Sequence, residues 1–236
     1  SPYAAMVARH LGTDHHEIRV PVGQGSLALI DEVLSQFDQP FGDSSAVPSY
    51  LMCRAVRPFV KVVIGGDGGD EMFGGYPRYG YADFARTLGR APTWILRAML
   101  LLSHAVSRVS PSERVRQVQR LLRAAEASGN ERLLALSCYL FPEELQGMLT
   151  PSARQKTTDY VPMLMGAGDR SRGVGGADFI DATMNTALPG DYLRKVDMMS
   201  SAHGLEVRIP FLGESVLACS ARIPERWKYS VGENKR

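Results

Sequence analysis

The stretch "VVIGGDGGDEMFGGY", residues 62–76, most constrains how this chain can fold, because an apolar run stops abruptly in glycines and carboxylates. The run Val60–Ile64 is rich in β-branched residues, which favour a strand. Six glycines and three acids follow within the stretch. Glycines let a backbone turn sharply and approach a ligand, and open α/β sheets bind ligands where such strands end. The pattern therefore predicts a strand, a ligand-binding turn and a helix.

The acids of this turn indicate a cation in the site. Bare carboxylates repel phosphate, whereas Mg²⁺ is typically held by one or two carboxylates together with phosphate oxygens. Asp70 and Glu71 are expected in the first helical turn, where the helix dipole favours negative charge. The stretch matches neither GxxxxGK[ST] nor GxGxxG, and its spacing is not that of an EF-hand. A ligand-free turn before a helix capped by Asp70 is the alternative interpretation.

Helices and strands alternate in the first part of the chain. Apolar residues recur at helical spacing over Pro2–Leu11, residues 27–37 and Pro48–Val56, whereas residues 16–22 and Val60–Ile64 have strand character. Such alternation is typical of a parallel α/β sheet.

After Tyr76 the strand signal nearly vanishes, and the rest of the chain is predicted to be mainly helical. A glycine-rich loop is expected at residues 166–179. The expected helices are Tyr81–Leu88, Thr93–Val106, Ser112–Ala127, Glu131–Tyr139, Pro142–Leu149, Phe179–Leu188 and Asp191–His203.

The helix predicted over Ser112–Ala127 has the clearest signals at its ends. Ser112 is its expected N-cap, and Gly129-Asn130 its expected C-terminal stop. Its basic residues suit a solvated face better than a phosphate-binding patch. These residues are Arg114, Arg116, Arg120 and Arg123.

Composition places the chain among soluble globular proteins. Of its 236 residues, 44% are hydrophobic and 22% are charged. A net charge of +2 gives no strong attraction to nucleic acid or membrane. The longest apolar run, Trp94–Val109, is interrupted by Arg97 and His104, so a buried helix is expected rather than a membrane span.

Cysteine and histidine usage argues against disulfides and zinc. Cys53, Cys138 and Cys219 form no CxxC pair, which favours reduced thiols and a cytoplasmic protein. His15 and His16 are adjacent, and neighbouring strand residues point to opposite faces, so joint ligation of a metal is not expected.

Four motifs in order carry a resemblance to a known family. They are "LGTDHHE", "DQPFGDSSAVPSYLM", "VVIGGDGGDEMFGGYPRY" and "LPGDYLRKVDMMSSAHGLEVRIPFL". Together they resemble the synthetase domain of glutamine-dependent asparagine synthetases. The similarity runs nearly from Ser1 to Arg236 and is weakest over residues 85–175.

The resemblance implies an adenine-nucleotide α-hydrolase-like, Rossmann-like parallel sheet with a large helical extension. One partial synthetase domain would span residues 1–236, with an α/β part over 1–80 and a mainly helical part over 81–236. Such an enzyme adenylates aspartate with Mg-ATP and releases pyrophosphate. Ammonia from an N-terminal glutaminase domain then attacks the acyl-adenylate. The implied partners are these small molecules, the glutaminase domain and a second copy in a homodimer.

The resemblance also assigns roles to individual residues. Asp70 would bind Mg²⁺, Asp67 and Glu71 would shape the charged site, and Tyr76 would lie near the acyl-adenylate. Lys235, in "GENKR", would stabilise the negative charge that both chemical steps build up. The floor of the substrate and adenylate site would be Gly65, Gly66, Gly68 and Gly69. Ser44, Asp191 and Arg194 would approach the substrate, whereas Asp197, Glu206 and Arg208 are expected to be mainly architectural.

Departures from the family pattern keep two alternatives open. The sequence lacks the family's pyrophosphate loop, Ser-Gly-Gly-x-Asp-Ser, and its glutaminase domain. This suggests a fragment that is inactive alone. Such a fragment is expected either to self-associate or to be marginally stable. Ser44 stands where some members have an arginine that holds the acceptor acid, Asp67 is one methylene shorter than the acid of well-studied members, and Gly213 replaces a common aspartate. A related ligase or lactam-forming enzyme acting on another acid is one alternative. A non-catalytic homologue is the other.

Overall fold

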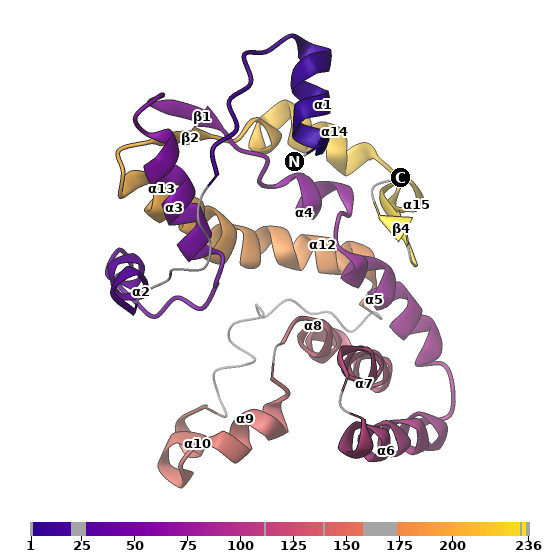
Figure 1. Ribbon diagram of the computed structural model, residues 1–236. Coiled ribbons are helices and arrows are strands. Elements are labelled where there is room, and N and C mark those ends of the chain that lie inside the picture. Colours follow the sequence, from indigo (N-terminus) through magenta and orange to yellow (C-terminus); the bar gives the residue numbers. More distant parts are fainter. Residues whose placement is uncertain are drawn as a thin grey trace. The chain divides into compact units, whose positions relative to one another are not determined.

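A computed structural model describes residues 2–19, 27–110, 112–138, 140–157, 174–231 and 233–234 (Figure 1). The chain divides into two compact units. The first comprises Ser1–Gly65 and Asp191–Arg208, and the second comprises Gly66–Gly190 and Ile209–Arg236. The described part is mostly helical with a small parallel sheet, which fits an α/β class.

The first unit contains a two-stranded parallel sheet and four helices. Its strands β1 (Val62–Ile64) and β2 (Glu206–Arg208) pair in parallel, with Val62 opposite Glu206 and Ile64 opposite Arg208. Its helices are α1 (Pro2–Leu11), α2 (Leu27–Leu34), α3 (Ala46–Val56) and α13 (Leu193–Ser201). Helices α3 and α13 pack side by side (Figure 1). Their core is formed by Val33, Phe37, Ala46, Tyr50 and Met199, and Phe37 stacks on Phe41 with ring centroids 4.2 Å apart.

The strand predicted over residues 16–22 is wrong in its described part. Residues 16–19 have no regular structure, and residues 20–22 lie outside the described ranges. The apolar pattern was too weak, because Ile18 is the one apolar side chain in residues 16–19 and is 41% exposed. The described partner of β1 is instead β2, a strand from the far end of the chain that the sequence analysis had not identified.

A charged cluster ties α3 to α13 within this unit. Lys195 Nζ donates to Asp43 Oδ2 at 2.7 Å and to Ser45 Oγ at 2.7 Å. The Ser45 backbone N–H and hydroxyl also donate to the Asp43 carboxylate, at 2.9 and 2.8 Å. Burial raises the pKa of Asp43, but these hydrogen bonds and the Lys195 charge outweigh it, so its pKa is lowered from 3.8.

This cluster leads to a prediction about acid stability. A lowered folded-state pKa means that ionised Asp43 stabilises the protein above pH 3.8, and that this contribution is lost as pH falls through the folded pKa. We expect Asp43→Asn to cost about 1–3 kcal/mol near neutral pH, and progressively less below pH 3.8. Urea unfolding at several pH values measures the difference. Asp14→Asn, at a side chain that is 89% exposed, is the control, and an Asp43→Asn cost that does not change with pH would contradict the account.

The second unit is a helical assembly that starts at the acidic turn. It contains α4 (Gly69–Phe73), α5 (Pro77–Leu88), α6 (Thr93–Val109), α7 (Glu113–Glu126), α8 (Gly129–Ser137), α9 (Pro142–Met148), α10 (Pro151–Thr157) and α12 (Gly176–Asn185). After α12, the π-helical turn η1 (Leu188–Tyr192) leads into α13. The last described segments of the second unit are η2 (Pro210–Leu212), α14 (Glu214–Arg222), α15 (Glu225–Lys228), β3 (Tyr229–Ser230) and β4 (Glu233–Asn234). None of the helices in the described ranges is long and apolar enough to cross a membrane.

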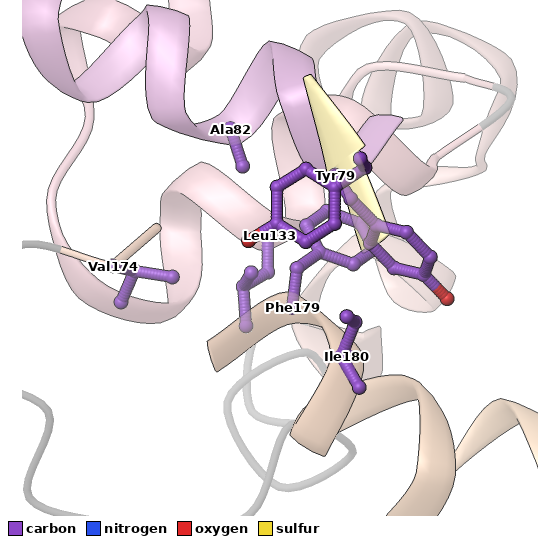
Figure 2. Packing of buried hydrophobic residues seen from close by; sticks show 7 residues of the cluster. Tyr79, Ala82, Leu133, Val174, Phe179 and Ile180 are labelled. Atoms are coloured by element: carbon purple, nitrogen blue, oxygen red, sulfur yellow. The ribbon is translucent and has the colours of Figure 1, made fainter. Parts of the chain in front are cut away.

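Two apolar clusters hold this unit together. In the first, Tyr79 of α5 is fully buried and meets Phe179 of α12 edge-on, with ring centroids 5.7 Å apart (Figure 2). Ala82, Leu133, Val174, Ile180 and Tyr229 complete that cluster. The second joins α5, α6 and α7 through Ala85, Leu96, Leu122, Ala124 and Ala125.

Several predicted helix ends need correction. Helix α5 begins at Pro77, four residues before the predicted start, because proline suits the first helical position. Gly129, expected to close α7, opens α8 with φ +52° instead, and α7 already ends at Glu126. Helix α12 begins inside the predicted loop at Gly176, where Asp178 Oδ2 accepts the Gly175 N–H at 2.9 Å.

Two predictions about burial are also wrong. Helix α6 was expected to be buried, but only Leu96 and Ser103 are buried, while Trp94 is 72% exposed. The basic face of α7 was expected to be solvated, which holds for Arg114, but Arg116, Arg120 and Arg123 are partly buried. Arg123 lies 4.1 Å from the Phe141 ring centroid, and Arg116 pairs with Glu144 at 3.0 Å. The aliphatic stems of arginines cover apolar surface well, which the charge pattern alone does not indicate.

Candidate functional site

The acidic turn forms a left-handed bend that opens a short helix. Gly68 is the N-cap of α4 with φ +84°, a conformation that side chains with a Cβ rarely adopt. A Cβ at Gly68 would lie 2.6 Å from Leu212 Cδ2, so the bend also needs glycine for space. The prediction that Asp70 and Glu71 lie in the first helical turn is confirmed. The alternative of Asp70 as N-cap is wrong, because Gly68 takes that position.

A pocket of ≈ 630 Å³ opens beside this turn in the second unit. Its polar side is formed by Gly66, Gly69, Asp70 and Lys228. Its apolar side is formed by Phe73, Phe211, Ile223, Pro224 and Trp227. The pocket therefore combines one carboxylate, one ammonium and backbone at two glycines with an apolar wall. Such a combination is typical of small-ligand sites.

The Asp70 carboxylate is fitted closely against Gly75. A Cβ at Gly75 would lie 2.0 Å from Asp70 Oδ1 and 2.6 Å from Asp70 Cγ. The Gly75 N–H also donates to the Asp70 carbonyl at 2.8 Å, which closes the helix onto the carboxylate. Gly75 thus fixes where the carboxylate lies, a role that the sequence analysis did not assign to it.

Glu71 and Tyr76 are joined to each other. Tyr76 Oη donates to Glu71 Oε1 at 2.7 Å, and Glu71 is only 3% exposed. The Tyr76 ring meets Tyr79 edge-on at 5.8 Å, and the Arg78 guanidinium lies 4.4 Å from the Tyr76 centroid. Neither Glu71 nor Tyr76 lines the described pocket. Their hydrogen bond instead connects Glu71, in the first turn of α4, to Tyr76, the N-cap of α5.

The other expected site residues are distributed over both units. Asp67 and Gly68 are in the turn of the second unit but do not line the pocket. Gly65 ends the first unit, where its N–H donates to the Arg208 carbonyl at 2.8 Å. Lys235 lies outside the described residues.

Ser44, Asp191 and Arg194 all belong to the first unit. Ser44 is exposed, and Arg194 Nη2 donates to Asp38 Oδ1. Burial raises the pKa of Asp191, and the neighbouring Asp43 charge adds to this, against the opposing charge of Lys195. The charges of the Asp43–Lys195 cluster therefore act on Asp191.

Lys228, Trp227 and Phe211 line the pocket but were missed by the sequence analysis. "RIPERWKY" has no motif that distinguishes a site lysine from a surface one, and "IPFL" suggests an ordinary core segment. Their place in the pocket depends on folding the end of the chain against α4, which local patterns do not reveal.

The residues present fit a magnesium ion that is shared with a ligand. Among the described residues, no three His, Cys, Asp or Glu side chains come together as a full protein-only metal site. Mg²⁺ needs fewer, because it commonly takes one or two carboxylates and completes its shell with phosphate oxygens and water. Asp70, on the pocket wall beside Gly66 and Gly69, is the carboxylate suited to that role.

Comparisons with known proteins point to one family. A model of the asparagine synthase family matches residues 1–236. Glutamine-hydrolyzing asparagine synthetase 1 of Bacillus subtilis is 29% identical over 87% of this chain and 32% of its own length. Asparagine synthetase B of Escherichia coli is 40% identical over 36% of this chain and 16% of its own length. The chain thus spans about a third of the length of the first relative, and a comparison with solved structures gave no match. Because the family match covers every residue, the chain belongs to the asparagine synthase family.

Proposed function

We propose that this chain carries the synthetase chemistry of a glutamine-hydrolysing asparagine synthetase, an ATP-dependent amide ligase. The observation that carries the proposal is the Asp70 pocket, which lies at the acidic glycine turn of a chain that matches the family throughout. In the first step a carboxylate oxygen of aspartate attacks the α-phosphorus of ATP, and pyrophosphate leaves. In the second step ammonia attacks the acyl carbon, AMP leaves, and the nitrogen loses a proton to give asparagine.

The residues of the second unit would bind and orient the nucleotide. Asp70 would hold Mg²⁺, which when bound would offset charge on the phosphate oxygens. Gly66 and Gly69 present backbone without side chains to the pocket, so a phosphate or adenylate can approach closely. Gly68 would complete this floor, and the same role is proposed for Gly65, which ends the first unit. The hydrogen bond between buried Glu71 and partly buried Tyr76 would keep the α4 turn rigid, and Asp67 would add negative charge near the ion.

The remaining roles concern the acceptor acid and the nitrogen source. Ser44, Asp191 and Arg194 of the first unit would recognise the acceptor acid, and Lys235 would stabilise charge in both steps. Ammonia would come from a glutaminase domain of the full-length protein, which we expect to act in the cytoplasm as a homodimer. The fold would belong to the adenine-nucleotide α-hydrolase-like class.

A second candidate keeps the adenylation and changes the acid. It is favoured by Ser44, an exposed neutral side chain where some asparagine synthetases have an arginine for the aspartate carboxylate. Mass spectrometry of the products separates the two candidates. The full-length protein is incubated with Mg-ATP, ammonium and a panel of carboxylic acids. Asparagine as the amide product supports the first candidate, and an amide of another acid supports the second.

Alanine at two neighbouring glycines is expected to separate folding from nucleotide binding. Gly68→Ala should cost about 1–3 kcal/mol of stability, because of its positive φ and the Leu212 contact. Gly66→Ala should leave the thermal midpoint unchanged, because no described atom lies within 4 Å of the added Cβ. It should nevertheless weaken Mg-ATP binding about tenfold, equivalent to about 1.4 kcal/mol, by filling the pocket. Calorimetric titration and thermal unfolding of both variants in the full-length protein test this, and unimpaired Mg-ATP binding by Gly66→Ala would contradict it.

A further inference from the structure

A lysine in the lining of the pocket has no assigned role. Lys228 ends α15, is partly buried, and lines the same pocket as Asp70. Within the described part of the chain, no carboxylate lies within ion-pair distance of its Nζ. Burial lowers the pKa of Lys228, while the charges of Glu225 and Asp181 oppose that shift. A partly buried ammonium that has lost solvent is stabilised by an anionic ligand.

The segment that carries Lys228 is held firmly in the second unit. Tyr229 is 4% exposed, and its hydroxyl donates to Glu225 Oε2 at 3.2 Å. Gly74, Gly80 and Gly176, all distant in sequence from residues 228–230, make room for these residues. A Cβ at Gly74 would lie 3.0 Å from the Lys228 carbonyl, one at Gly80 2.6 Å from the Ser230 carbonyl, and one at Gly176 2.3 Å from Tyr229 Oη. The lysine backbone is therefore fixed directly against the turn that ends α4.

The chemistry of the pocket selects the class of ligand. An oxyanion would pair with the Lys228 ammonium on one side and reach a cation held by Asp70 on the other. The glycine backbone at Gly66 and Gly69 leaves space for the oxygens.

We propose that Lys228 is an anion-binding residue of this site, taking a phosphate or carboxylate group of a bound substrate or product. The inference rests on the proposed function for the identity of those groups. It adds Lys228 to the site as a second cationic residue, distinct from Lys235. The two sources of the oxyanion are pyrophosphate, from the nucleotide, and the carboxylates of the acceptor acid.

Calorimetric titrations of the full-length protein test the proposal. Magnesium pyrophosphate and aspartate are titrated separately into the wild type, Lys228→Gln, Lys228→Arg and the control Lys61→Gln, whose side chain is exposed in the first unit. We expect Lys228→Gln to weaken one of the two ligands about tenfold, and Lys228→Arg to restore most of that affinity, because it keeps the charge. Weaker pyrophosphate binding identifies phosphate as the anion, and weaker aspartate binding identifies carboxylate.

Tryptophan fluorescence gives an independent measure. Trp227 lines the same pocket, so a change in emission that the Trp227→Phe variant of the full-length protein lacks reports on ligand binding there. Binding of the ligand whose affinity depends on Lys228 should change the emission of Trp227. Affinities within twofold of the wild type for both ligands in Lys228→Gln would overturn the proposal, as would a wild type that binds neither. Asparagine formation is measured separately. If the wild type makes no asparagine but its pyrophosphate binding depends on Lys228, the proposed function is disproved and this inference stands.

Discussion

Replacing Asp70 by asparagine is expected to lower aspartate-dependent pyrophosphate release by about 10²–10³-fold, the usual effect of removing one group that stabilises transition-state charge. The change keeps the size of the side chain on the pocket wall but removes the negative charge proposed to hold Mg²⁺. The fold should persist, so circular dichroism and the thermal midpoint should stay close to those of the wild type. Initial rates across a range of magnesium concentrations give the measurement.

Two further variants make this result specific. Asp31→Asn removes a carboxylate from an exposed position on α2 and should change the rate less than twofold. Gly75→Ala keeps the Asp70 carboxylate but displaces it, because the new Cβ would lie 2.0 Å from Asp70 Oδ1. It should therefore raise the magnesium concentration needed for half-maximal rate. Asp70→Asn with wild-type activity at low magnesium would exclude Asp70 as the metal ligand.

Replacing Arg132 by methionine is expected to cost about 3–5 kcal/mol of stability, the largest stability effect that we predict for a single residue. Arg132 is 6% exposed and donates to the carbonyls of Ala124, Val174 and Ala127 at 2.8, 3.0 and 2.8 Å. Without the guanidinium, these carbonyls lose their donor in a buried region. Burial lowers the pKa of Arg132, and the Arg86 charge lowers it further. The three hydrogen bonds stabilise the guanidinium against this loss of solvent.

Urea unfolding of the full-length protein measures this cost. Arg108→Met, at an exposed position of α6, should change stability by no more than about 0.5 kcal/mol. Arg132→Lys should fall between the wild type and Arg132→Met, because an ammonium cannot reach three separated carbonyls as a planar fork can. Equal stabilities of Arg132→Met and Arg108→Met would show that this hydrogen-bonded arginine is not needed.

Local signals predicted many of the helices and the acidic turn well. Helix α1 has the predicted limits, Pro2–Leu11, and Ser112 Oγ accepts the Val115 N–H at 3.3 Å as the expected N-cap of α7. These features depend on residues within one or two helical turns. Gly129 misled the prediction because glycine can end one helix or begin the next, and the choice depends on the neighbouring segments.

Long-range contacts account for most of what the sequence analysis missed. The partner of β1 is β2, which begins at Glu206, and no local pattern links the two strands. Gly74, Gly80 and Gly176 are needed because residues 228–230 pass close to them, so their role appears only when the chain is folded. Lys228 reaches the Asp70 pocket by the same packing. The glycine–carboxylate turn itself was recognisable, because its unusual composition is concentrated in one short stretch.

Pyrophosphate release by the full-length protein tests the proposed function most directly. Mg-ATP and ammonia are supplied with and without aspartate, and pyrophosphate, AMP and asparagine are measured together. The account predicts release only with aspartate, with one pyrophosphate and one AMP formed for each asparagine. Release that does not depend on aspartate, or no release from a folded protein that binds Mg-ATP, would contradict it.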